Sequence, residues 1–450
     1  MNSQTGLERL RGSLADAPMT AGQIVVVVLM VLIAAMDGYD VQAMSFVAPV
    51  VSKAWAIDKA TLGMLLGASL FGMAGGAIAL SPFADVYGRR PLVLTALLLV
   101  TTGSLMSALA GSTWELAASR VITGLGIGVM VSLTTSIAAE FSSRRRRGLA
   151  VASTSIGFAL GGVAGGLVTA GILKQHDWHW VFGIGSAAGV VLLLAATWLP
   201  ESPAFLIERR PRNALQRLNR VLLQIGQPPL KELPQRTQTQ RGSYRALFSR
   251  DMALTMVRLA AVFLLMTTAS YYLISWLPQL VADAGFPPST ASRVAATASA
   301  VGIAAGLIFG SLAARIGPAK LTGTAMIGFG IALAALGCVP AALPPLLIAA
   351  SACGFFLSAA TAVFYASLTE SFPPLMRVSG IGFVMGFGRL LSGVGPFFAG
   401  AMFAAGFGRS GVSLVFAALA VVAGLLMLAP LLACRPSHAL REGGEQPGVR

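Results

Sequence analysis

The sequence contains twelve apolar runs of about 20 residues, and this pattern restricts the possible folds more than any other feature. A helix of that length crosses a hydrocarbon core of about 30 Å. Soluble domains carry about 25% charged residues, whereas this chain carries 11%. We therefore predict an all-α membrane protein with twelve transmembrane helices. Their approximate ranges are 21–43, 61–83, 91–111, 114–138, 148–172, 180–199, 253–281, 290–313, 320–339, 341–369, 378–405 and 411–434.

A polar stretch near the middle divides the twelve runs into two sets of six. The two halves echo each other, because Glu140 and Arg147 align with Glu370 and Arg377 at a shift of 230 residues. Residues 215–223 predict a short basic amphipathic helix at the membrane surface, with a solvated linker as the alternative. The predicted parts are an N-terminal tail (1–20), a first six-helix half (21–199), a central loop (200–252), a second six-helix half (253–434) and a C-terminal tail (435–450).

The formal net charge of +15 is explained by where the basic residues lie. With twelve spans, both tails and the central loop share one side of the membrane, and that side carries 24 of the 32 Lys and Arg against five on the other. Basic residues concentrate in cytoplasmic loops, so we expect a multi-pass protein of a bacterial inner membrane with both termini in the cytoplasm. The charge then indicates contact with the lipid bilayer and not with nucleic acid.

Cysteine spacing gives no sign of a metal site, since the three cysteines are scattered through apolar surroundings. The sequence also lacks a nucleotide-binding loop and a nucleophile motif, so neither hydrolysis nor a cofactor is expected. We expect a monomer that is not an enzyme.

Ionisable side chains inside a span cost on the order of 3 kcal/mol each, so each one suggests a function. Asp37 and Asp40 are three residues apart, which places both carboxylates on one face of the first helix. Two acids so close repel each other's charge, and this repulsion favours binding a proton. The alternative is that one of them caps a broken helix beside Gly38 or pairs with a neighbouring arginine.

Arginines in the fourth and eleventh spans, Arg120 and Arg389, belong one to each half. A guanidinium stays charged and offers a planar fork that matches a carboxylate, so both are candidate anchors for an organic anion. For Arg120, an internal ion pair with Asp37 or Asp40 is the alternative. Aromatic side chains offer stacking surface for a ring-bearing substrate or, alternatively, ordinary packing. The candidates are Tyr39, Tyr271, Tyr272, Trp276, Phe364 and Tyr365.

Several motifs together resemble the major facilitator superfamily over nearly the whole chain. They are Asp85-x-x-Gly88-Arg89-Arg90, Arg120-x-x-x-Gly124-x-Gly126-x-Gly128 and Pro200-Glu201-Ser202. The first span adds Asp37-Gly38-Tyr39-Asp40, which is similar to the Asp-Gly-Phe-Asp signature of the aromatic acid:proton symporter family. The resemblance implies the major facilitator fold. It also implies that an arginine in the fourth and in the eleventh helix takes part in substrate binding or transport.

The resemblance further implies a gate on the cytoplasmic side, in which Asp85 latches the outward-facing state. Asp85 could pair with Arg147 or accept hydrogen bonds at a neighbouring helix N-terminus. The equivalent loop of the second half has Ala314 and Pro318 where an acid and an arginine are expected, so that second latch is degraded. The gating residues are Asp85, Gly88, Arg89, Arg90, Glu140, Arg147, Glu370 and Arg377.

These observations predict a transporter, driven by the proton gradient, that imports a small aromatic carboxylate such as benzoate or a hydroxybenzoate by alternating access. Three alternatives stay open: a symporter of a non-aromatic organic acid, a proton-coupled efflux antiporter, and a membrane chemoreceptor for aromatic acids.

Overall fold

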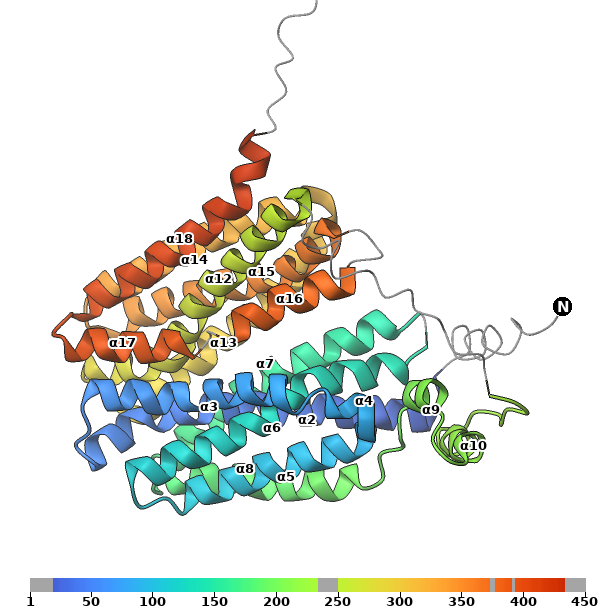
Figure 1. Ribbon diagram of the computed structural model, residues 1–450. Coiled ribbons are helices and arrows are strands. Elements are labelled where there is room, and N and C mark those ends of the chain that lie inside the picture. The colour runs from blue at the N-terminus through green and yellow to red at the C-terminus, as the bar shows by residue number, and fades with distance from the viewer. Residues whose placement is uncertain (1–18, 144, 234–249, 373–376, 391–392, 434–450) are drawn as a thin grey trace, which may run out of the picture.

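The computed structural model describes residues 19–143, 145–233, 250–372, 377–390 and 393–433, and the regular secondary structure within these ranges is helical (Figure 1). The first half contains α2 (Ala21–Ala54), α3 (Lys59–Ala79), α4 (Phe83–Tyr87), α5 (Arg89–Ala108), α6 (Thr113–Glu140), α7 (Arg147–Ile172) and α8 (His179–Ala196). Two short helices follow, α9 (Pro203–Arg209) and α10 (Ala214–Gln224). The second half contains α12 (Arg250–Asp283), α13 (Pro288–Ile316), α14 (Pro318–Cys338), α15 (Leu343–Ser371), α16 (Arg377–Leu390), α17 (Val394–Ala404) and α18 (Arg409–Ala433).

Eleven of the described helices are long and apolar enough to cross a membrane, which confirms the predicted fold class. The eleventh predicted span, 378–405, is the exception, because it forms two shorter helices, α16 and α17. Pro396 lies in the first turn of α17, where its missing N–H breaks no intrahelical hydrogen bond. The first helix is longer than predicted, since α2 continues through Pro49 to Ala54.

Polar side chains begin several of the membrane-length helices by binding the free N–H groups of the first turn. Thr20 and Gln23 form a capping box at the start of α2. Asp58 accepts a hydrogen bond from the N–H of Thr61 at 3.1 Å at the start of α3. The hydrogen bonds from Thr61 hold the pKa of the Asp58 carboxyl below its usual value. The starts of both helices are therefore set by local sequence.

The two halves use the same pairwise packing. In the first half α3 packs on α6, α5 on α6 and α5 on α8, and in the second half α13 packs on α15, α14 on α15 and α14 on α18. The contact between α3 and α6 is close enough to require glycine, since a methyl group at Gly124 would lie 2.1 Å from the carbonyl oxygen of Ser69. The glycine run that begins at Gly124 thus serves helix packing.

The halves meet at one end of the bundle, which we call the far end and which includes Lys59 and Asp283. There α3 packs on α17 and α7 packs on α13. A methyl group at Gly63 would lie 2.9 Å from the Cα of Gly400, so α3 and α17 touch through their backbones. Opposite to it is the near end, where α2 begins and where α9 and α10 lie (Figure 1).

The helix α10 confirms the amphipathic pattern predicted for residues 215–223. Its apolar side chains, Leu218, Val221 and Leu222, are buried in a cluster with the near ends of the first-half helices. Thr20 also donates a hydrogen bond to the carbonyl oxygen of Ile225, which ties the helix to the start of α2. The apolar face therefore packs against the first half of the protein, and the position of the helix at the membrane surface stays a prediction.

Candidate transport site

Two buried acids lie on α2 in the middle of the first half. Asp37 is 2% exposed and Asp40 is 0% exposed. Their spacing places them about 60° apart around the helix axis. Oδ1 of Asp40 accepts a hydrogen bond from Oγ of Ser104 on α5 at 2.6 Å, while Oδ2 has no partner among the described residues. No hydrogen bond to the Asp37 side chain occurs within the described part of the chain, so the pair is poorly compensated for its burial.

Arg120 of α6 is fully buried beside this acid pair. It donates to Oγ1 of Thr123 at 2.5 Å and to the main-chain oxygen of Asp40 at 3.3 Å. Its guanidinium carbon lies 4.8 Å from the ring centroid of Phe182, a cation–π contact. Nε has no partner among the described residues. Arg120 thus reaches Asp40 through the backbone, and the described contacts include no ion pair between its guanidinium and either carboxylate.

Three residues of the motif from Asp37 to Asp40 contact different neighbouring helices. A methyl group at Gly38 would lie 1.9 Å from the carbonyl oxygen of Phe158, so α7 can approach α2 only at a glycine. The hydroxyl of Tyr39 donates to the carbonyl oxygen of Val181 on α8 at 2.6 Å. The glycine therefore brings α7 close, the tyrosine is held by α8, and Asp40 faces α5 and α6.

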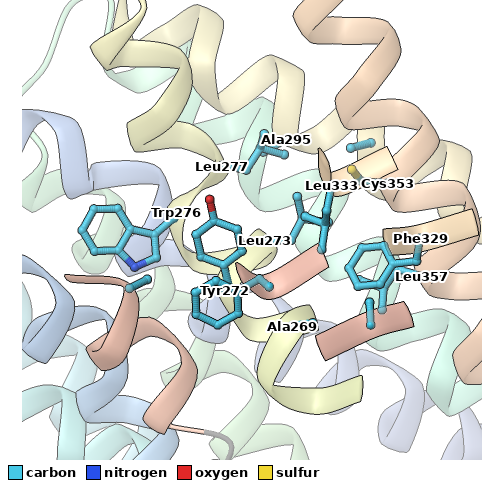
Figure 2. Packing of buried hydrophobic residues seen from close by; sticks show 14 of the residues in the cluster. Ala269, Tyr272, Leu273, Trp276, Leu277, Ala295, Phe329, Leu333, Cys353 and Leu357 are labelled. Carbon is cyan, nitrogen blue, oxygen red and sulfur yellow. The ribbon is translucent and has the colours of Figure 1, made fainter. Parts of the chain in front are cut away.

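Two of the predicted aromatic contacts are occupied in packing within the second half (Figure 2). The hydroxyl of Tyr272 lies 2.8 Å from Oγ of Ser413, and its ring stacks on Phe416 at 4.2 Å between centroids. Nε1 of Trp276 donates to the carbonyl oxygen of Pro396 at 3.0 Å. Both residues are 0% exposed. In this conformation neither side chain has a face or a polar atom free for a substrate.

The other aromatic candidates differ in their surroundings. Phe364 is buried and stacks on Phe263 at 5.5 Å between centroids. Tyr365, the next residue of α15, is 39% exposed. Tyr271 of α12 packs against a cluster that belongs to the first half and includes Met36. Arg389 lies on α16, but its side chain is outside what the structure describes.

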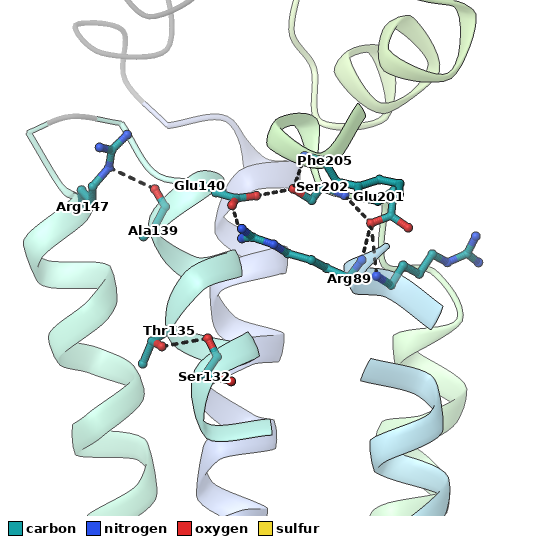
Figure 3. Close-up of polar contacts among 10 residues, drawn as sticks. Arg89, Ser132, Thr135, Ala139, Glu140, Arg147, Glu201, Ser202 and Phe205 are labelled. Carbon is teal, nitrogen blue, oxygen red and sulfur yellow. Dashed lines mark hydrogen bonds and ion pairs between the residues drawn. The ribbon is translucent and has the colours of Figure 1, made fainter. Parts of the chain in front are cut away.

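Four of the predicted gating residues come together at the near end (Figure 3). Arg89 forms an ion pair with Glu140, which also accepts a hydrogen bond from Oγ of Ser202. Gly88 has a φ of 109°, a conformation that favours glycine, and it turns the chain between α4 and α5. Beside it, Glu201 accepts hydrogen bonds from the backbone N–H groups of Arg89 at 2.9 Å and Arg90 at 3.2 Å.

The remaining gating candidates lie apart from this network. Asp85 is exposed on α4, and Glu370 is exposed near the end of α15. Nε of Arg147 donates to the carbonyl oxygen of Ala139 at 3.2 Å, so the described contacts show no pairing between Asp85 and Arg147 (Figure 3). Arg377 begins α16, with its side chain outside the described residues.

Sequence reasoning missed several partners of these residues. Ser104, Thr123 and Phe182 surround the Asp40 and Arg120 pair, yet each is an ordinary residue of an apolar span and carries no recognisable pattern. Glu201 and Ser202 belong to a quoted motif, but nothing in their spacing showed that they hold the start of α5 and the end of α6.

A bundle of two similar halves, each built of membrane-length helices and with two acids and an arginine buried in one of them, defines a polytopic transport protein. The family model described as Major Facilitator Superfamily matches residues 30–342 and 259–448. The chain belongs to the major facilitator superfamily, a family of transporters and not of enzymes.

Similar proteins include transporters of aromatic acids. The chain is 31% identical over 397 residues to the 3-(3-hydroxy-phenyl)propionate transporter of Escherichia coli (strain K12), covering 88% of this chain and 90% of that protein. It is 30% identical to the 4-hydroxybenzoate transporter PcaK of Pseudomonas putida, covering 83% and 84%. Among solved structures, the inward open conformation of the xylose transporter XylE from E. coli matches with a TM-score of 0.71 at 16% identity, over 90% of this chain and 95% of that one.

Proposed function

We propose that this chain is a symporter that imports a small aromatic carboxylate together with protons across a bacterial inner membrane. The observation that carries the proposal is the buried pair Asp37 and Asp40 beside the buried guanidinium of Arg120. Buried acids that form no ion pair in a water-poor site bind a proton readily, and they can release it when the site opens to water. The names of the relatives support an aromatic acid as the substrate.

The cycle follows from this arrangement. The anion enters between the halves and binds an arginine, Arg120 or Arg389, while its ring stacks on aromatic side chains, of which Tyr271 and Tyr365 are the less enclosed. Protonation of the acid pair neutralises the loaded site, and the halves then rock to expose it to the other side. One proton with a monoanion is electroneutral, so the pH gradient alone drives that stoichiometry, whereas a second proton adds about 2.3 kcal/mol per 100 mV.

The orientation and the gate belong to the same proposal. The near end, where α2 begins and the Arg89 network lies, faces the cytoplasm according to the distribution of basic residues. Asp85 and Arg147 are not in contact in the conformation described, so a latch between them forms in the opposite conformation. The far end, where the halves touch, is then the closed periplasmic side.

The test is uptake of labelled 4-hydroxybenzoate into proteoliposomes with an imposed inward pH gradient. Wild type should accumulate the label, and at least one of Asp37→Asn and Asp40→Asn should lose accumulation while keeping exchange against preloaded substrate, because exchange needs no net proton movement. Asp58→Asn is the matched control, since it removes an exposed acid that only caps α3. Wild type that binds the label but never accumulates it would overturn the proposal and favour a receptor.

A competition panel separates the substrate classes. Benzoate and hydroxybenzoates should compete with the label, and aliphatic acids of the same charge should not. Competition by aliphatic acids alone would favour the symporter of a non-aromatic acid. Release of label from loaded vesicles driven by inward proton movement would favour an efflux antiporter.

A further inference from the structure

The hydroxyl of Ser104 donates its hydrogen bond to a different kind of acceptor from those used by neighbouring hydroxyl residues. Ser107 donates to the carbonyl oxygen of Gly103 at 2.8 Å, and Thr123 donates to that of Ser119 at 3.0 Å. Such bonds back to the preceding turn are usual for hydroxyls inside helices. Ser104 is fully buried and instead donates to Oδ1 of Asp40, on a different helix. Its single proton therefore serves the acid and not its own helix.

The other groups around Asp40 show how much its carboxylate depends on this hydrogen bond. Arg120 binds the main-chain oxygen of Asp40, so among the described residues Ser104 supplies the hydrogen bond that the carboxylate receives. The charged and titratable groups around the carboxylate are Asp37 and Tyr39 on its own helix and Arg120 on α6. The facing part of α8 contributes Gly185, where a methyl group would lie 3.6 Å from Oδ1 of Asp40.

The two acids are therefore not equivalent. One oxygen of Asp40 is held by a donor, and the other, Oδ2, is buried and without a partner among the described residues. Asp37 has no described donor on either oxygen. A donor stabilises the ionised form of a carboxylate, so it makes release of a bound proton easier. Asp40 thus has both an atom that can take a proton and a group that helps it to give the proton up.

We propose that Asp40 carries the transported proton on Oδ2 and that Ser104 is a positioning residue that sets how tightly the proton is held. The inference rests on the proposed function and adds to it which of the two acids is used and what tunes it. The proton enters by binding Oδ2, which gives the neutral acid, and leaves from the same atom. Ser104 keeps its own proton throughout.

The experiment measures uptake by proteoliposomes as a function of external pH. In Ser104→Ala the ionised carboxylate loses its donor and binds protons more tightly, so the pH at which uptake is half-maximal should rise by about one unit. Ser104→Thr keeps a hydroxyl and should retain the wild-type profile, and Ser104→Cys, a weaker donor, should shift it less than alanine does. Ser107→Ala is the matched control, because it removes a buried hydroxyl one turn away and should leave the profile unchanged.

Two results would overturn the inference. One is a Ser104→Ala profile that coincides with that of wild type. The other is accumulation that survives in Asp40→Asn and is lost in Asp37→Asn. If alanine prevents folding, the comparison of the cysteine and threonine variants decides the question by the same shift. Failure of the proposed function is distinct, because wild type itself would then show no accumulation driven by the pH gradient.

Discussion

The two ends of the bundle are held in different ways. At the far end the contacts join the halves, through the backbones of Gly63 and Gly400 and through the ion pair between Lys59 and Asp283, at 2.6 Å. At the near end the described ionic network, from Arg89 to Glu140, stays within the first half. Contacts between halves must form and break in a cycle of alternating access, whereas contacts within a half can persist. The far end therefore sets the conformational equilibrium, and the near end sets the stability of one half.

The largest effect should come from preventing contact at the far end. Gly400→Val adds a side chain at a position where even a methyl group would lie 2.6 Å from the carbonyl oxygen of Lys59, so α3 and α17 cannot close. We expect uptake to fall more than tenfold, since a state that cannot form cannot complete the cycle. Two measurements check this prediction. One is uptake, and the other is the labelling of a cysteine engineered at the far end, which should increase when that end cannot close. Gly171→Val is the matched control, because no atom lies within 4 Å of that position.

The outcome that would contradict this prediction is specific. If Gly400→Val transports normally and the labelling of the far-end cysteine does not increase, the contact between α3 and α17 is ordinary packing. The two ends would then not differ in the way proposed.

An intermediate effect should follow from breaking the near-end network. Arg89→Ala leaves the largely buried carboxylate of Glu140 with the hydroxyl of Ser202 but without its cation. We expect a loss of about 1–3 kcal/mol in the stability of the first half. Thermal unfolding in detergent should show a lower Tm, while the labelling of the far-end cysteine stays as in wild type. Arg90→Ala is the control, because the Arg90 side chain is exposed and donates only to a carbonyl oxygen.

A change in far-end labelling with an unchanged Tm would mean that the near-end network also controls the equilibrium between states. In that case both ends would influence the conformational equilibrium, and they would differ only in the size of that influence.

The sequence predicted the fold because each span is long, apolar and separated from the next by polar residues. It missed the division of the eleventh span into α16 and α17, since Arg389 is the only charged residue from 378 to 405 and no polar stretch marks a helix end there. The acid pair and Arg120 could be predicted because a charge inside a span stands out. Ser104 and Phe182 could not, because a serine or a phenylalanine in a span is common, and their role depends on which helices meet at Asp40.

The far-end ion pair escaped sequence reasoning for a related reason. Lys59 and Asp283 are 224 residues apart, and each is one of several charges at a helix end. Only the contact between the two halves shows that they are partners.

The smallest effect should come from this ion pair. Its side chains are 31% and 44% exposed, so water and salt screen the attraction, and such a pair contributes about 0.2–1 kcal/mol. Loss of the attraction alone corresponds to an increase of about 1.4- to 5-fold in the labelling rate of the far-end cysteine, and Lys59→Glu, which also adds repulsion, should raise the rate at least that much. The double variant Lys59→Glu with Asp283→Lys should restore the wild-type rate, and high salt should abolish the difference. Lys53→Glu, an exposed lysine near the same end, is the control. If the double variant behaves as the sum of its single changes, the pair does not couple the halves, and backbone packing at Gly63 and Gly400 alone holds the far end closed.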